Sequence, residues 1–159
     1  MSLEDKLPTS EVIHATLVFE RLVSAAVAEV FAAFADTDAK SKWGAPSDTA
    51  ALIYDKTDFR EGGIEQFRCG SKSDPNIHGT THYLRVNKNS GFVSTETIDV
   101  DGKRLCASLT TLELFEAGVK TRLRLTSQVA SFIGQDMIKG HEIGNNASLD
   151  NLCRYFDKT

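Results

Sequence analysis

Residues 134–158, GQDMIKGHEIGNNASLDNLCRYFDK, are the stretch on which the fold assignment depends. Four apolar side chains recur in it at the i, i+3, i+4, i+7 spacing of one helix face: Leu149, Leu152, Cys153 and Phe156. Before this stretch, most of the chain between residues 11 and 129 has the pattern of β-strands. A helix that follows a long run of strands must bury its apolar face against the sheet. The sequence therefore predicts an α+β domain that ends in a helix.

The first half of this stretch leaves two structures open. Gly140, Gly144, Asn145 and Asn146 are poor helix formers, and each glycine costs about 1 kcal/mol relative to alanine. In one structure a loop comes first and the helix begins near Ala147. In the other, one long helix runs through the stretch, and its small side chains leave space over the sheet. Composition alone favours neither.

Length and composition predict one ordinary globular domain. The 159 residues include 41% hydrophobic residues, and the formal net charge is −4. The charges are interspersed without a basic block, so nucleic acid is not an expected partner. No run approaches the roughly 18 to 20 apolar residues of a membrane span. Residues 1–11 lack the apolar region of a signal peptide, so we expect a flexible tail there and a single domain over residues 12–159.

The three cysteines, Cys69, Cys106 and Cys153, are odd in number, widely spaced and without a CxxC pair. This pattern argues against a disulfide framework or a zinc site and favours buried, reduced thiols in a cytoplasmic protein. The sequence also has no GxSxG nucleophile motif and no phosphate-binding glycine loop. We therefore expect no cofactor and no metal. The sequence leaves open whether the protein is a monomer or a homodimer.

The rest of the chain reads as two short helices among strands. After a strand at residues 12–23, an amphipathic helix from Val27, with Ser24 as its cap, is expected to end near Asp36. A second helical piece is expected at residues 38–43. Further strands are predicted at residues 49–59, 64–69, 79–86, 91–100, 104–116 and 119–129, with a polar loop at residues 70–76. Their short connections, above all Asp101-Gly102, require an antiparallel sheet.

This order of elements resembles the START-like (SRPBCC) helix-grip superfamily. The local match is with the bacterial branch similar to the activator of the Hsp90 ATPase. Residues 21–46, RLVSAAVAEVFAAFADTDAKSKWGAP, resemble the opening signature of that branch, and residues 58–63, DFREGG, match its D-x-R-x-G-G turn. Residues 91–96 and 121–123 resemble its later strands, and residues 144–152 its terminal helix. The resemblance implies a curved sheet of six or seven strands around one long C-terminal helix, with a cavity between them.

Four positions depart from the family pattern. Ala26 and Thr37 stand where the family usually has proline, and both changes are conservative for the fold. Gly44 replaces the second residue of a Trp-Trp pair, and Asn145 replaces a tryptophan on the terminal helix. Both losses remove aromatic volume near the implied cavity, so we expect a larger or more polar pocket than is usual in the family.

Two strand residues suggest chemistry on the inner side of the sheet. His78 and His82 have HxxxH spacing, but four strand residues span about 13 Å, too far for one metal ion. His82 shares its parity with Leu84 and Val86, which suggests that it faces the core. Glu96 shares its parity with apolar neighbours, and an unpaired buried carboxylate needs a partner, water or a raised pKa. Glu96 and His82 would form an acid–base pair if their strands bring them together. Otherwise Glu96 lies solvated near a bulge or the cavity mouth.

Parity and family position together predict a ligand site lined by six residues: Trp43, Phe67, His82, Glu96, His141 and Asn145. The leading hypothesis is binding of a small hydrophobic or amphipathic ligand in the cavity. A second is a chaperone partner, as the family name implies. A third is a cyclase-, hydrolase- or isomerase-like enzyme that uses Glu96 and His82. We favour the binding role over catalysis.

Overall fold

The structure, a computed structural model, describes residues 12–157. The predicted tail, residues 1–11, and residues 158–159 lie outside this range. The elements follow in the order β1 (Ile13–Val23), α1 (Val27–Ala35), α2 (Thr37–Trp43), β2 (Ala50–Lys56), β3 (Ile64–Ser71), β4 (Asp74–Asn87), β5 (Gly91–Val100), β6 (Lys103–Ala117), β7 (Lys120–Ser131) and α3 (Gln135–Asp157). The predicted strands and helices are all present.

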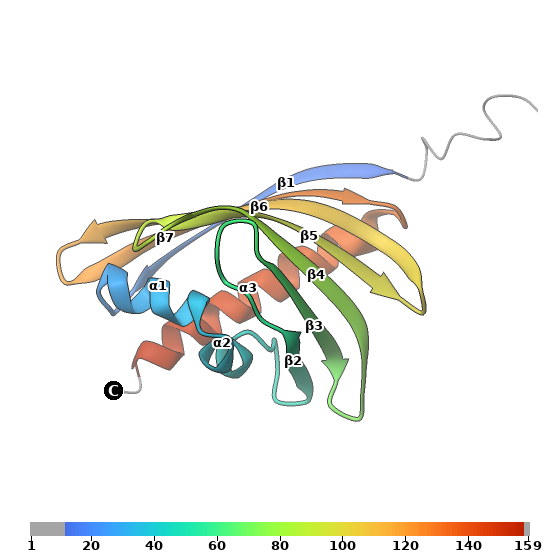
Figure 1. Cartoon of the computed structure of the whole chain (residues 1–159), viewed down its shortest axis with the longest axis horizontal. Helices are drawn as coiled ribbons and strands as arrows, with labels where there is room; N and C mark the ends of the chain where they lie inside the picture. The colour runs from blue at the N-terminus through green and yellow to red at the C-terminus, as the bar shows by residue number, and fades with distance from the viewer. Residues whose placement is uncertain (1–11, 158–159) are drawn as a thin grey trace, which may run out of the picture.

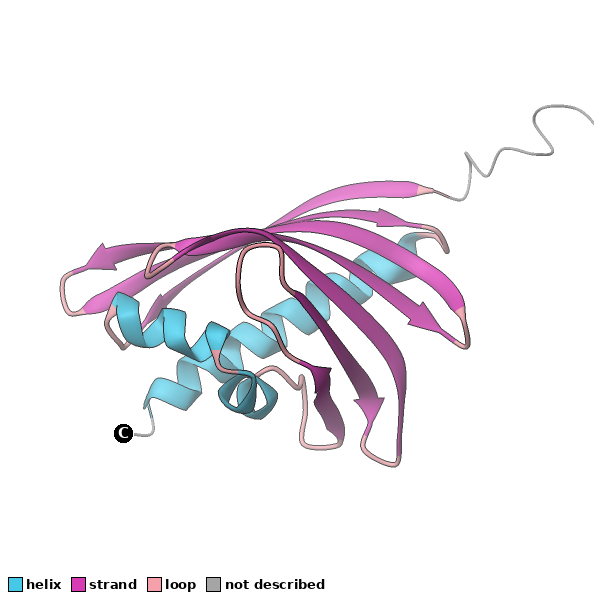
Figure 2. Ribbon diagram, viewed as in Figure 1, coloured by secondary structure: helices cyan, strands magenta, loops and turns pink. Residues whose placement is uncertain are grey.

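The seven strands form one antiparallel sheet in the order β1-β7-β6-β5-β4-β3-β2. Because β1 and β2 are the two edges, α1 and α2 must cross one face of the sheet to connect them. All three helices lie on that face, below the curved sheet in Figure 1, and we call it the inner face. Figure 2 shows the opposite face, the outer face, free of helices. This arrangement is a helix-grip α+β fold, as predicted.

The long C-terminal stretch is one helix of 23 residues, so the long-helix alternative is correct. Its buried residues, Ile138, Leu149 and Leu152, lie at helical spacing on one stripe. α3 approaches β1 most extensively, and β7 and α2 less. Tertiary packing of this stripe outweighs the poor helix propensity of the glycines and asparagines.

Aromatic side chains form the core between α1, α2 and the inner face. Phe34 packs edge-on against Trp43 at 4.8 Å between ring centroids, and Tyr83 packs against Phe59 at 4.8 Å and Phe92 at 5.4 Å. The indole of Trp43 is 5% exposed, and its Nε1 donates to the carbonyl of Ala33 at 3.1 Å. Such edge-to-face pairs add to the burial of apolar area.

Three local predictions need correction. Ser24 does not cap α1, because the helix begins at Val27 with Ala26 at the N-cap and no side-chain cap. Asp36 instead caps α2, accepting from the backbone N–H of Asp38 at 2.9 Å. The polar loop expected at residues 70–76 is shorter, because β3 extends to Ser71 and β4 already begins at Asp74.

The third correction concerns β4. A β-bulge between Tyr83 and Arg85 inserts Leu84 as an extra residue. After the bulge, Val86 faces the core. Before the bulge, Tyr83 faces the core, and His82 points to the outer face and is exposed. The parity shared with Val86 does not carry across the bulge, so the expectation that His82 faces the core is wrong.

Candidate ligand-binding site

Short side chains cover the middle of the inner face. Thr81, Ser94, Ser108 and Ser127, from four neighbouring strands, are buried there. The register places Glu96 between two of them, with Thr81 opposite on β4 and Ser108 opposite on β6. Hydroxyl-bearing residues of this size fill less space than the Leu and Phe side chains of the core, and they provide hydrogen-bonding groups. This part of the inner face is therefore lined by small, polar side chains.

Five ionisable or phenolic side chains gather beside this area, and we call them the inner polar cluster: Lys40, Tyr54, Glu65, Tyr83 and Glu96. Glu65 on β3 is 1% exposed. Its Oε1 accepts from the Tyr83 hydroxyl at 2.6 Å, and its Oε2 accepts from the Asp58 backbone N–H at 3.1 Å. Two donors thus satisfy a carboxylate that would otherwise be costly to bury.

Lys40 reaches the cluster from α2. Because the Tyr83 hydroxyl donates its proton to Glu65, its oxygen is free to accept from Lys40 Nζ, which lies 3.5 Å away. Nζ also lies 5.5 Å from the centroid of the Tyr54 ring. Burial lowers the pKa of Lys40, while the negative charges of Glu65 and Glu96 oppose that shift. Within residues 12–157, Lys40 has no carboxylate oxygen within ion-pair distance.

Glu96 is the second desolvated charge. Burial raises the pKa of Glu96, and the nearby positive charge of Lys40 opposes the shift. The side chain is nevertheless only half-buried, so part of its surface remains accessible. Its inward orientation was predicted from strand parity.

Cys106 and His141 connect β6 with the first half of α3. The Cys106 sulfur lies 3.3 Å from Nε2 of His141. Burial raises the pKa of Cys106 to about 12 and lowers the pKa of His141. Both side chains are therefore neutral near pH 7, and the contact is a thiol–imidazole hydrogen bond without a reactive thiolate.

The six predicted site residues lie in different places. Phe67 and Glu96 are on the inner face, and His141 reaches it from α3. Asn145 is half-buried on the helix stripe, between His141 and Leu149. Trp43 belongs to the aromatic core.

His82 is the one predicted site residue that lies on the outer face of the sheet. It lies opposite Thr95, whereas Glu96 lies opposite Thr81, so strand alternation puts His82 and Glu96 on opposite faces of the sheet. The expected acid–base pair of Glu96 and His82 is wrong, and with it the enzymatic hypothesis built on that pair.

Sequence reasoning missed four members of the inner polar cluster. Glu65 shares its parity with Phe67 and Cys69, the same signal that singled out Glu96. Lys40 precedes Trp43 by one helical turn, which places it on the buried side of α2. The inward orientation of Tyr83 could not be predicted from parity, because the bulge that follows it reverses the alternation along β4.

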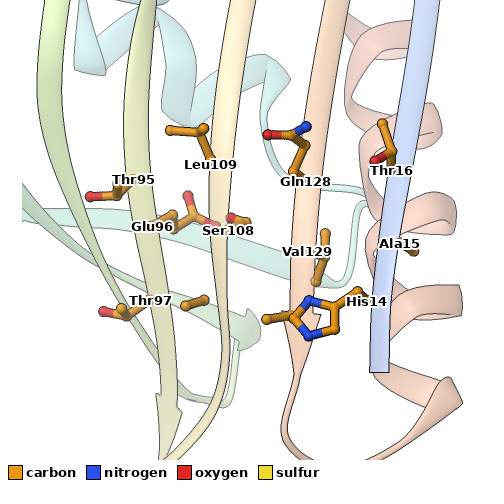
Figure 3. Close-up of a pocket in the computed structure, with 12 residues that line it drawn as sticks. His14, Ala15, Thr16, Thr95, Glu96, Thr97, Ser108, Leu109, Gln128 and Val129 are labelled. Atoms are coloured by element: carbon orange, nitrogen blue, oxygen red, sulfur yellow. The ribbon is translucent and has the colours of Figure 1, made fainter. Parts of the chain in front are cut away.

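One open depression is on the outer face. It measures about 590 Å³, and the side chains that point into it come from β1, β5, β6 and β7: His14, Thr16, Thr95, Thr97, Ala107, Leu109, Gln128 and Ala130. Figure 3 views it with the helices behind the sheet. A smaller one of about 260 Å³ lies between β1 and α3, beside Arg21 and Asn146. These two depressions are not the cavity that the resemblance implies.

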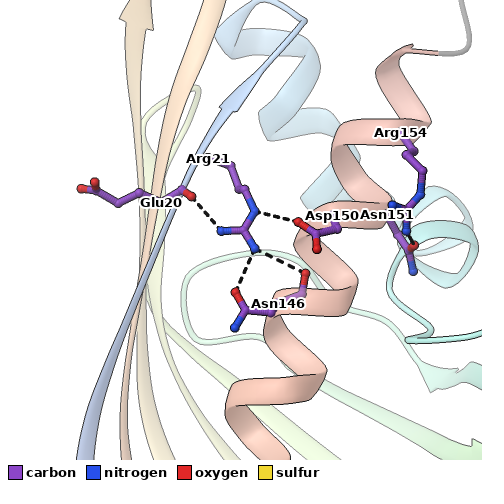
Figure 4. A network of polar contacts seen from close by, with 6 residues as sticks. All are labelled: Glu20, Arg21, Asn146, Asp150, Asn151 and Arg154. Carbon is purple, nitrogen blue, oxygen red and sulfur yellow. Dashed lines mark hydrogen bonds and ion pairs between the residues drawn. The ribbon is translucent and has the colours of Figure 1, made fainter.

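Arg21 holds the middle of α3 against β1 (Figure 4). Its guanidinium donates to Asp150 Oδ1 at 3.0 Å and to Asn146 Oδ1 at 2.8 Å, and Nη1 donates to the backbone carbonyl of Glu20 at 2.8 Å. In the same turns of α3, the side chains of Ser148 and Asn151 donate to the backbone carbonyls of Gly44 and Ala45, which follow α2. These contacts fix α3 over the inner face.

The fold and the inner polar cluster define a helix-grip protein of the START-like type with a polar inner face. Residues 24–157 match the family described as activator of Hsp90 ATPase homolog 1-like protein, so the chain belongs to that family. No protein with a curated description matches the sequence. No helix among residues 12–157 is long and apolar enough to cross a membrane. In the same range, no three His, Cys, Asp or Glu side chains are grouped to hold a metal ion.

Solved structures of similar proteins share the fold over almost the whole chain. Protein Mll3558 from Rhizobium loti is 33% identical, covers 91% of this chain and 98% of its own, and superposes with a TM-score of 0.79. An uncharacterised protein from Rhizobium leguminosarum is 28% identical, covers 93% of this chain and 97% of its own, and has a TM-score of 0.81. CalU16 from Micromonospora echinospora is 20% identical with a TM-score of 0.61, covers 91% of this chain and 85% of its own, and shows the shared fold alone.

Proposed function

We propose that the protein binds a small amphipathic molecule between the inner face of the sheet and the first half of α3. One observation carries this proposal: Glu96 is desolvated yet accessible, and it faces Lys40 without forming an ion pair. Two such side chains are costly to keep apart in a dry interior. A ligand head group with hydrogen-bonding atoms would satisfy both.

The apolar side chains next to the inner polar cluster suit the hydrophobic part of an amphipathic ligand. Phe67, Ile98 and Ile138 belong to one buried apolar cluster on the inner side of the sheet, next to the row that contains Glu96. Asn145 and His141 lie on the same side of α3 as Ile138, so they face this region from the helix. A mostly apolar surface with a few convergent polar groups is typical of small-molecule sites.

Three tryptophan substitutions test this location. Asn145→Trp fills the space under the first half of α3 and should weaken binding of an amphipathic fluorescent probe, anilinonaphthalene sulfonate, by about tenfold or more. Ile143→Trp adds the same indole to the solvent side of α3, where Ile143 is 70% exposed, and should leave the dissociation constant unchanged. Ala107→Trp fills the outer-face depression and should likewise have no effect. Circular dichroism and thermal unfolding check that each variant is folded.

The pattern of the three variants decides the outcome. Loss of probe binding in Asn145→Trp alone supports the inner site. If Ala107→Trp weakens binding and Asn145→Trp does not, the ligand lies on the outer face and the proposal is wrong. Native mass spectrometry of the purified protein would then identify a co-purified molecule and its class.

A further inference from the structure

Lys40 differs in its surroundings from the other lysines between residues 12 and 157, which are exposed. It extends from α2 into the inner polar cluster, where its Nζ contacts the hydroxyl oxygen of Tyr83 at 3.5 Å and lies over the ring of Tyr54. Lys42, two residues further along the same helix, is exposed to solvent. A lysine without an ion pair in a desolvated site is a common starting point for nucleophilic amines in proteins.

We propose that Lys40 is a carbonyl-reactive amine that forms a reversible imine with an aldehyde held on the inner face. This inference rests on the proposed function, because the aldehyde must first occupy the same space between the sheet and α3. It adds a reactive group and a chemical class of ligand to that site.

The neighbours of Lys40 favour the neutral amine. Burial lowers the pKa of Lys40 against the opposing charges of Glu65 and Glu96. Burial, and then the hydrogen bond to Glu65, keep the pKa of Tyr83 above its ordinary value, so this phenol stays protonated and gives its proton to Glu65. Burial likewise raises the pKa of Tyr54. The Tyr83 oxygen can then accept an N–H of Lys40 and orient the nitrogen, which leaves the amine lone pair for another partner.

The reaction conserves atoms and electrons without an added oxidant or reductant. The Lys40 lone pair attacks the carbonyl carbon, and the carbonyl oxygen takes up a proton to give a carbinolamine. Loss of the second N–H proton and departure of the oxygen as water then leave a C=N bond. Glu96 shares the inner face with this amine, and in the proposed reaction its carboxyl group gives a proton to the leaving oxygen and recovers one from nitrogen. Hydrolysis reverses every step.

Reductive trapping tests the proposal on the unmodified protein. The protein is incubated with octanal and sodium cyanoborohydride between pH 6 and pH 9, and the alkylated lysines are located and quantified by peptide mass spectrometry. Lys40 should be alkylated clearly faster than Lys42 at pH 7, because burial lowers the pKa of Lys40 and so raises the fraction of neutral amine. Octan-1-ol, which cannot form an imine, should protect Lys40 and leave Lys42 unaffected.

Each outcome distinguishes this inference from the proposed function. Fast, octanol-sensitive labelling of Lys40 supports both. If octanol displaces the fluorescent probe but Lys40 reacts no faster than Lys42, the imine is wrong and inner-face binding stands. If octanol neither displaces the probe nor protects Lys40, both proposals fail. A Lys40→Arg variant should lose the fast-reacting site. A Lys42→Arg variant, at the exposed lysine of the same helix, should keep both the fast labelling of Lys40 and probe binding.

Discussion

The two halves of α3 differ in what they bury. In the second half, Leu149 and Leu152 are 1% and 0% exposed and belong to the larger core cluster with α1 and the neighbouring strands. In the first half, Ile138 is the buried apolar residue, and the half-buried His141 and Asn145 continue its stripe. One continuous helix thus packs against the apolar core in its second half and covers a more polar part of the inner face in its first half. Stability and ligand binding should therefore respond to different substitutions along the same helix.

The largest expected effect is in the anchoring half. Leu152→Ala should lower the free energy of unfolding by about 3 kcal/mol, because it removes a fully buried side chain and leaves a cavity in the core. Ile143→Ala, a truncation on the exposed side of the first half, should change it by less than about 0.5 kcal/mol. Urea unfolding followed by circular dichroism measures both. Equal losses in the two variants would show that the halves do not differ as described.

A smaller effect, of opposite sign, is expected beneath the first half. The pKa of Glu96 is raised above its ordinary 4.5, so the folded protein binds its proton more tightly than the unfolded chain does. The stability that this carboxyl group contributes is therefore complete below that value and is lost as pH rises through the folded pKa. Glu96→Gln should raise the free energy of unfolding by about 1 kcal/mol at pH 7.

The same variant should show little or no gain at pH 4, where Glu96 is protonated in both states. Urea unfolding at both pH values, with an exposed control such as Glu142→Gln, measures the difference. A gain that is equal at pH 4 and pH 7 would mean that the charge of Glu96 is not the cause.

Sequence predicted the elements well, and the exceptions have physical causes. Hydrophobic periodicity and turn residues located all seven strands, because alternation and turns are local properties. The long form of α3 was left open by composition, since its poor helix formers are held by tertiary contacts that lie far away in sequence, such as Arg21 with Asn146 and Asp150.

The candidate site was less predictable than the fold. The inward orientation of Glu96 was predicted correctly because the alternation along β5 is unbroken before it, whereas His82 was misplaced by a bulge that a parity argument cannot detect. Lys40 was missed because its environment depends on how α2 crosses the sheet. The resemblance to a known family gave the architecture but not this cluster.

A third test compares two glycine-to-alanine substitutions, one within the first half of α3 and one just before the helix. Gly144→Ala should raise the free energy of unfolding by about 0.5 to 1 kcal/mol, since the new Cβ meets nothing within 4 Å and alanine favours the helix. Gly134 has equally open surroundings but a φ of +94°. Gly134→Ala should therefore destabilise the protein by about 1 kcal/mol. Thermal unfolding compares the two, and a loss of stability in Gly144→Ala would show that the first half is packed more tightly than described.

The smallest expected effect lies at the junction of the two halves, where Arg21 bridges Asn146 and Asp150. Asp150→Asn removes the charge of a partly exposed ion pair but keeps an oxygen acceptor at the same place, so it should cost only about 0.3 kcal/mol. The loss should disappear at 1 M salt, where the charges are screened. Asn146→Leu removes the acceptor of the more buried bond and should cost about 1 kcal/mol at any salt concentration. A large, salt-dependent loss in Asp150→Asn would instead make the ion pair, rather than the Leu149–Leu152 anchor, the main attachment of this part of α3.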